Sequence, residues 1–158
     1  MLGLLSQRLL TVLQLTRMAL VFTAIADSLC ALSLWARWRA GQGQPLWTQL
    51  DVMQLSGVAA MSIGLYGFGM SLNDITDRRR DRQLASHRPL PSGRIGLPAA
   101  HVVCAVLALT AAIGGAIVAM RSGAPAMSTA LFAWTGALIV FYDFAGKYLV
   151  APGLLTLG

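Results

Sequence analysis

The sequence has no glutamate and only one lysine, and charged residues make up 11% of its 158 positions. Water-soluble domains usually contain about a quarter charged residues, so this shortage argues against a soluble enzyme or binding domain. Aromatic residues are also few, at 8%, whereas hydrophobic residues reach 56% and the mean hydropathy is +0.66. The chain is therefore expected to be an integral membrane protein.

Cysteine is scarce as well, with Cys30 and Cys104 in different apolar stretches. Two such thiols give neither a disulfide framework nor a metal-site spacing, so both are expected to be free. The 11 Arg and one Lys give a net charge of +6, but six of these 12 residues fall between Arg78 and Arg94. One basic loop at the border of apolar spans is typical of a membrane surface or a polyanionic ligand, and it argues against a nucleic-acid-binding face.

Four runs with at most one charge each are long enough to cross a bilayer, which takes about 20 apolar residues in a helix. They cover approximately residues 18–36, 52–72, 97–120 and 122–142. A fifth apolar run at 148–158 has 11 residues, too few for a span. The predicted fold is therefore all-α, a multi-pass transmembrane helix bundle with four complete spans and the start of a fifth, in a single domain over 1–158.

The flanks of the spans predict how the chain lies in the membrane. No short apolar core with a small-residue cleavage site opens the sequence, so the first helix is expected to be retained. Basic residues favour the cytoplasmic side, and nine of the 12 lie on one side of the predicted spans. We therefore expect the amino terminus and a motif loop at about residues 73–96 to be cytoplasmic, in an inner (plasma) membrane.

Glycine is frequent inside the second and third spans. The residues are Gly57, Gly64, Gly67, Gly69, Gly114 and Gly115. Because glycine lets helix backbones approach closely, we expect these spans to make close helix contacts. Backbone flexibility near the end of the second span is the alternative interpretation.

A polar segment with regular spacing follows the second span. Asn73, Asp77 and Asp81 are each four residues apart, and Asp74 precedes Asp77 by three. On an α-helix these four side chains form one stripe, so their oxygens are expected to converge. Such oxygens suit Mg²⁺, which binds through one or two carboxylates together with phosphate oxygens. The spacing predicts a metal and diphosphate site. The alternative is a solvated cluster in which the aspartates pair with the arginines at 78–82.

The polar segment continues as HRPLPSGRI, a connection rich in turn-forming residues. Arg88 in this connection is a candidate for contacting phosphate oxygens, and a role in setting membrane topology is the alternative. His87 and His101 have no second histidine or cysteine at a metal spacing. We assign neither histidine a catalytic role.

Two aspartates lie outside the polar segment. Asp27 is deep in the first span, where an ionisable side chain is costly and is a functional candidate. We expect it either to face a polar cavity and contact an acceptor, or to hydrogen-bond to a neighbouring helix. Asp143 is expected to be exposed at the end of the fourth span, four residues before Lys147 and within reach of it for an ion pair.

These segments together resemble a known family. The run NDITDRRRD followed by RPLPSGRI is similar to the first signature of the UbiA superfamily of intramembrane prenyltransferases. Upstream, TRMALVFTAIAD resembles the first-helix segment of that family, and downstream FYDFAGKYLVAPGLLTLG resembles its Tyr-x4-Lys segment. The resemblance covers nearly all of this chain but only about the first half of the family's usual length. A second Asp-rich motif, found in the family's later half, is absent from this sequence.

The resemblance implies an enzyme that transfers a polyprenyl group from a Mg²⁺-bound polyprenyl diphosphate to an aromatic or other lipophilic acceptor. It implies that Mg²⁺ is bound by Asn73, Asp74, Asp77 and Asp81, with the three aspartates as catalytic residues. It also implies diphosphate contacts by Asn73, Arg88 and Lys147. Tyr142 is implied as a contact in the reaction cavity, and an interfacial anchor is the alternative.

Two other interpretations remain open. One is a half-length membrane protein that binds a prenyl diphosphate, or a partner chain supplying the missing half, without turnover. The other is an unrelated small membrane protein, such as a transporter half that dimerises. A soluble isoprenyl diphosphate synthase also carries Asp-rich helices, but the long uncharged runs exclude it.

Overall fold

The structure is a computed structural model, and it describes residues 10, 11, 13, 18–40 and 50–149. Its regular elements, in chain order, are α2 (Met18–Ala40), α3 (Val52–Thr76), α4 (Arg78–Leu84), α5 (Leu97–Arg121), α6 (Pro125–Phe144) and the short 3-10 helix η2 (Gly146–Tyr148). The described part of the chain contains no strand. The prediction of an all-α bundle is confirmed.

Four of these helices are long and apolar enough to cross a membrane: α2 over Leu20–Arg39, and α3, α5 and α6 over their whole lengths. They coincide with the four predicted spans apart from a few residues at their ends. The largest difference is at α3, which continues to Thr76 because the polar residues after Leu72 still complete helical hydrogen bonds. Most of the fifth apolar run lies outside the described residues.

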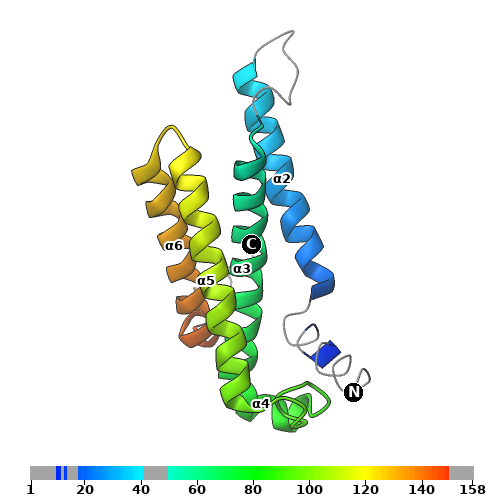
Figure 1. Ribbon diagram of the computed structural model, residues 1–158. Coiled ribbons are helices and arrows are strands. Elements are labelled where there is room, and N and C mark those ends of the chain that lie inside the picture. Colours follow the sequence, from blue (N-terminus) through cyan, green and yellow to red (C-terminus); the bar gives the residue numbers. More distant parts are fainter. Residues whose placement is uncertain (1–9, 12, 14–17, 41–49, 150–158) are drawn as a thin grey trace.

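Successive long helices run in opposite directions, with α3 packed against α2, α5 and α6 (Figure 1). This path returns the chain to the same end of the bundle after α5 and α6 (Figure 1). The polar end of α3, helix α4, the connection at residues 85–96 and the end of α6 therefore lie together. The fold gathers segments that are some 70 residues apart in the sequence at one end.

The contact between α3 and α5 depends on glycines, which have no side chain. A Cβ atom added to Gly64 would lie 2.3 Å from the backbone nitrogen of Ala111. One added to Gly114 would lie 2.4 Å from the backbone nitrogen of Met61. The two backbones are thus too close for any side chain at these positions. This confirms the predicted close helix contact, and the structure shows that these two spans are the partners in it.

Helix α2 contacts α3 through hydroxyl groups. The Oγ atoms of Ser28 and Ser62 lie 2.5 Å apart, and Ser62 Oγ also donates to the carbonyl of Ala24 at 3.2 Å. Both cysteines are free, as predicted, with Cys30 exposed and Cys104 buried. Hydroxyl contacts of this kind join transmembrane helices without burying a charge.

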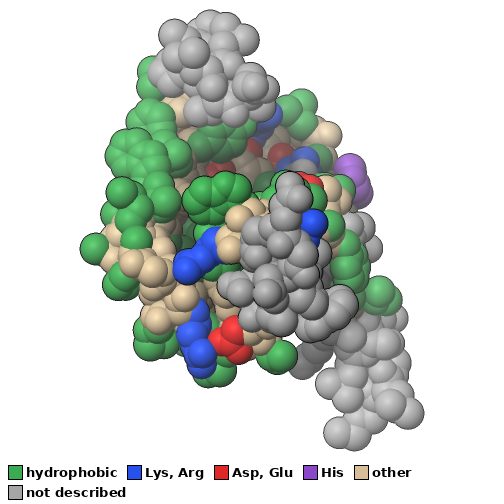
Figure 2. Space-filling model, turned by 90° about the horizontal axis from the view of Figure 1, so that it is seen from above, with side chains coloured by type: hydrophobic (Ala, Val, Ile, Leu, Met, Phe, Trp, Pro, Cys, Tyr) green, Lys and Arg blue, Asp and Glu red, His purple; other side chains and the backbone are tan. Residues whose placement is uncertain are grey.

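An ion pair closes the end of the bundle opposite the polar segment. Asp51 caps α3 by accepting a hydrogen bond from the backbone N–H of Met53 at 3.1 Å, and it lies 2.6 Å from Nη1 of Arg121 in the last turn of α5. The Asp51 and Arg121 side chains are 43% and 48% exposed. Seen toward this end, hydrophobic side chains cover much of the outside of the bundle (Figure 2), as expected for a surface that faces lipid.

Candidate active site at the polar end of the bundle

The polar segment begins in the last turn of α3 and continues through a junction into α4. Asp77 forms this junction, with its N–H donating to the Asn73 carbonyl at 2.9 Å. Its own carbonyl accepts from the N–H of Asp81, also at 2.9 Å. The helical hydrogen-bond pattern is therefore continuous across the junction, although two separate helices meet there.

The aspartates of this segment turn inward. Asp74, Asp77 and Asp81 are all buried, whereas three of the four neighbouring arginines of α4 are exposed. Within the described residues, none of these four arginines forms an ion pair with the three aspartates. This arrangement contradicts the alternative of a solvated charge cluster. Buried carboxylates need other partners, and the structure provides two cations from elsewhere in the chain.

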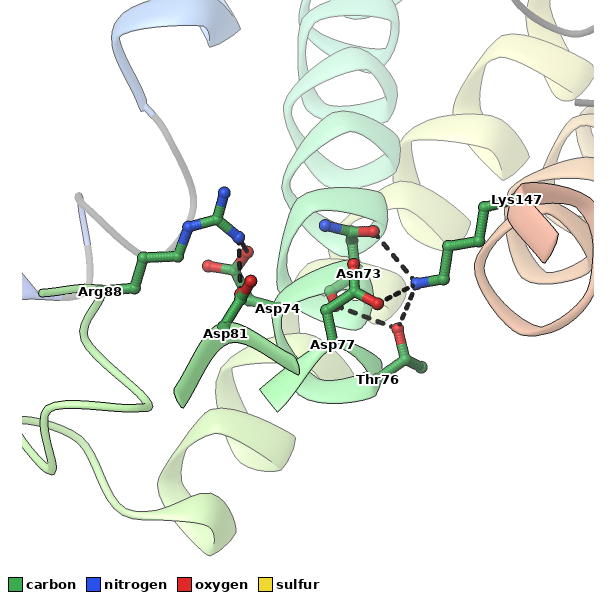
Figure 3. A network of polar contacts seen from close by, with 7 residues as sticks. All are labelled: Asn73, Asp74, Thr76, Asp77, Asp81, Arg88 and Lys147. Atoms are coloured by element: carbon green, nitrogen blue, oxygen red, sulfur yellow. Dashed lines mark hydrogen bonds and ion pairs between the residues drawn. The ribbon is translucent and has the colours of Figure 1, made fainter. Parts of the chain in front are cut away.

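Arg88 reaches the aspartates from the connection between α4 and α5 (Figure 3). Its Nη1 atom lies 2.6 Å from Oδ2 of Asp81 and 3.7 Å from Oδ1 of Asp74. The connection is held in place because Leu90 and Ala100 form a small buried core. A packed connection fixes where the guanidinium lies more firmly than a solvated loop would.

Hydrogen bonds within the connection hold the rest of its backbone in place. Arg94 donates to the carbonyl of His87 at 2.5 Å and to Ser92 Oγ at 3.2 Å. Gly93 has φ +76°, in the left-handed region that glycine adopts readily. The His87 side chain is exposed, and the His101 ring contacts the Leu97 carbonyl within α5 at 2.8 Å.

Lys147 reaches the aspartates from η2, on the side opposite Arg88 (Figure 3). Its Nζ atom lies 2.9 Å from Oδ1 of Asp77 and donates to Thr76 Oγ1 at 2.9 Å. The Lys147 and Asp77 side chains are each 9% exposed, so this is a buried ion pair. No spacing rule links these residues, because they meet only when α6 returns to the end of α3.

Asp143 corrects a prediction. The sequence predicts an exposed Asp143 within reach of Lys147. In the structure, Asp143 is only 3% exposed, and it is the one buried residue of α6. An i, i+4 pair requires a continuous helix, whereas α6 ends at Phe144 and the backbone turns at Ala145 toward η2. The ion pair that Lys147 forms at 2.9 Å is with Asp77. The only sequence signal for the burial of Asp143 is an ionisable residue in the last turn of an apolar span.

The amide of Asn73 lies between two carboxylates. With its oxygen toward Lys147, it accepts one hydrogen bond at 3.3 Å, the contact drawn in Figure 3. With its nitrogen on that side, it donates to Asp77 Oδ2 and to Asp143 Oδ1, each at 3.2 Å. Two hydrogen bonds to carboxylates outweigh one, and Lys147 keeps its contacts with Asp77 and Thr76. We therefore assign the second orientation.

The donor set of this site fits a divalent cation. Its four buried aspartates exceed its two cations by two negative charges, and an amide oxygen completes a set of hard ligands. Arg88 and Lys147 at present hold these carboxylates, and among the described residues no three His, Cys, Asp or Glu side chains are grouped to hold a metal ion. The predicted convergence on one metal is thus not a preformed site. The structure divides the motif into one pair beside Arg88 and another beside Lys147.

Two predicted site residues lie outside this network. Asp27 is on an exposed face of α2 and forms no hydrogen bond or ion pair with the described residues. Its neighbour Ser28 makes the contact with α3 instead. Tyr142 is half-buried beside Asp143 and has no hydrogen bond to the described part of the chain. The structure gives no support for Asp27 as a link between helices, and its contact with an acceptor stays a prediction.

Comparison with known proteins gives consistent results. The model of the UbiA prenyltransferase family matches residues 29–157. The 4-hydroxybenzoate octaprenyltransferase of Polaromonas sp. is 35% identical over 122 residues, which is 76% of this chain and 39% of the relative. The enzyme of the same name from Legionella pneumophila is 32% identical over 124 residues, which is 77% of this chain and 40% of the relative.

A third relative of that name, from Polynucleobacter asymbioticus, is 40% identical over 81 residues, which is 50% of this chain and 26% of the relative. The chain thus spans about two fifths of the length of the Polaromonas and Legionella relatives. No solved structure matches the chain.

Proposed function

This chain belongs to the UbiA prenyltransferase family, and from that premise we propose that it transfers a polyprenyl group from a polyprenyl diphosphate to an aromatic acceptor in the membrane. The acceptor class follows the relatives, whose names state octaprenyl transfer to 4-hydroxybenzoate. Family and relatives both support a membrane prenyltransferase. The particular acceptor and prenyl chain are part of the proposal.

One observation carries the proposal: a buried acidic cluster at the end of an apolar bundle, flanked by two cations. In the proposed site, Asn73, Asp74, Asp77 and Asp81 hold Mg²⁺. Bound Mg²⁺ would neutralise the negative charge that develops on the departing diphosphate. Diphosphate oxygens would take the place of carboxylates beside Arg88 and Lys147. Each cation would then bind the substrate without leaving an unpaired charge.

The remaining assignments follow from the same proposal. The prenyl chain would lie along the apolar helices, with Asp27 and Tyr142 as contacts for the acceptor or the cavity. The polar end would face the cytoplasm from an inner (plasma) membrane, because basic residues predominate at that end. The whole chain would act as one transmembrane domain.

A second candidate function is binding without turnover, which the division of the motif between Arg88 and Lys147 would also allow. The chain would then bind a polyprenyl diphosphate without transferring the prenyl group, or act together with a partner chain. Under this alternative, the site residues still bind the diphosphate, but no prenylated product is formed.

The test is transfer of an octaprenyl group to labelled 4-hydroxybenzoate by membranes that contain the chain. We expect Mg²⁺-dependent product, and loss of product in Asp77→Asn and in Asp81→Asn. Asp51→Asn is the matched control, since it changes an aspartate at the opposite end of the bundle and should retain product. Product at wild-type level in both site variants would contradict the proposal. Diphosphate binding without product would favour the second candidate.

A further inference from the structure

We propose that Asp143 is a positioning residue of this site, acting through Asn73. Its carboxylate holds the Asn73 amide so that the amide oxygen faces the proposed metal and diphosphate. This inference rests on the proposed function and assigns a role to a residue outside the Asn-Asp motif.

The burial of Asp143 is the first step of the argument. A buried carboxylate at the end of an apolar span is costly unless it is hydrogen-bonded, yet this is the one buried residue in α6. The nearby cation Lys147 contacts Asp77 and Thr76. The Asn73 amide, 3.2 Å from Asp143 Oδ1, is the hydrogen-bond donor for this carboxylate, and the charge of Lys147 also acts on it.

The geometry of the amide is the second step. An amide group has two N–H donors, and here one faces Asp77 and the other faces Asp143. When the amide nitrogen faces Asp77 and Asp143, the amide oxygen points in the opposite direction, toward Asp74 and Arg88. Figure 3 shows this direction of the amide. An oxygen on that side adds a neutral ligand where the other carboxylates of the motif lie.

The consequence of losing Asp143 follows directly. One amide donor would lack its acceptor, so the opposite orientation, with the oxygen accepting from Lys147 at 3.3 Å, would become competitive. The amide oxygen of Asn73 would then face the proposed metal ion for only part of the time. Residues that orient metal ligands typically change metal affinity by about 10-fold to 100-fold when they are removed.

The test uses the purified chain in lipid nanodiscs, with Mn²⁺ as the probe and inorganic pyrophosphate present. Free Mn²⁺ is followed by electron paramagnetic resonance. We expect Asp143→Ala to raise the half-saturating Mn²⁺ concentration about 10-fold. Asp143→Asn should stay within about threefold of wild type, because its amide oxygen can still accept from Asn73. Asp51→Asn is the matched control and should bind as wild type does.

A double variant separates positioning from a general structural role. If Asp143 acts through Asn73, then Asn73→Ala combined with Asp143→Ala should bind Mn²⁺ no more weakly than Asn73→Ala alone. Additive losses would overturn the inference. Where Asp143→Ala does not fold, Asp143→Asn decides alone, because a loss of about 10-fold or more in this variant would contradict a role that needs only an acceptor atom.

Failure of the underlying function has a different signature. A helical wild-type chain that retains no Mn²⁺ with pyrophosphate would contradict both the proposed site and the role of Asp143. Wild-type binding that is unchanged in Asp143→Ala would overturn the role of Asp143 alone and leave the proposed function standing.

Discussion

Two ion pairs in this chain show how surroundings decide what a pair of charges contributes. Lys147 and Asp77 meet at 2.9 Å with side chains that are nearly buried, whereas Arg121 and Asp51 meet at 2.6 Å while about half exposed. Removing one partner of a buried pair leaves an unpaired charge in a poor solvent. Removing one partner of an exposed pair leaves a charge that water can solvate.

The first prediction compares these two pairs. Lys147→Met should lower the free energy of unfolding by about 3 kcal/mol, because Asp77 would stay buried without its cation. Arg121→Gln should lower it by about 1 kcal/mol or less. Denaturant unfolding in detergent, followed by circular dichroism, measures both. Equal losses would contradict the assignment of Lys147 and Asp77 as a buried pair.

At the residue scale, the sequence predicted the identity of the motif better than its geometry. The regular spacing singled out the three motif aspartates, and the structure buries all three. Their partners could not be predicted, because Asp77 and Lys147 pair across 70 positions of the chain. Asp143 was misjudged for a local reason: the spacing rule assumed that α6 continues to Lys147, and it does not.

At the element scale, the bundle depends on how closely α3 and α5 approach. Hydropathy predicted these helices well, because a span must satisfy its backbone internally and an uncharged run of sufficient length leaves few alternatives. The glycines predicted a close helix contact, but not that α3 and α5 are the partners. The junction at Asp77 was not predicted, because a spacing of four residues is compatible with one helix or with two joined at a junction.

The second prediction concerns this contact. Gly64→Ala should lower the free energy of unfolding by about 1–3 kcal/mol, because its Cβ would overlap the backbone of Ala111. Gly136→Ala in α6 is the matched control, since nothing lies within 4 Å of the added Cβ. The control should be neutral or slightly stabilising, as alanine favours helix. If Gly136→Ala lost stability and Gly64→Ala did not, the assignment of the α3–α5 packing would be wrong.

At the scale of the whole molecule, the fold places two unlike ends on an apolar bundle. One end holds the acidic cluster with its two cations, and the other holds a half-exposed ion pair. The excess of basic residues at the first end predicts which end faces the cytoplasm. The sequence predicted both the number of spans and this asymmetry, because both depend on composition along the chain and need no long-range contact.

The third prediction tests this orientation. In a chain with Cys30 and Cys104 replaced by alanine, Gly123→Cys in the connection between α5 and α6 should react with an impermeant maleimide in intact cells. Ser86→Cys, in the connection after α4, should react only after the cells are permeabilised. Both positions are exposed, so access alone should decide the result. Labelling of Ser86→Cys alone in intact cells would reverse the orientation.

The central claim is that the polar end of this bundle binds a polyprenyl diphosphate through a divalent cation. The most direct measurement is equilibrium binding of labelled geranylgeranyl diphosphate to the purified chain in nanodiscs. We predict binding that requires Mg²⁺, is abolished by chelation and by Asp77→Asn or Asp81→Asn, and is retained in Asp51→Asn. Binding that is equally strong without Mg²⁺ and in both site variants would contradict the claim.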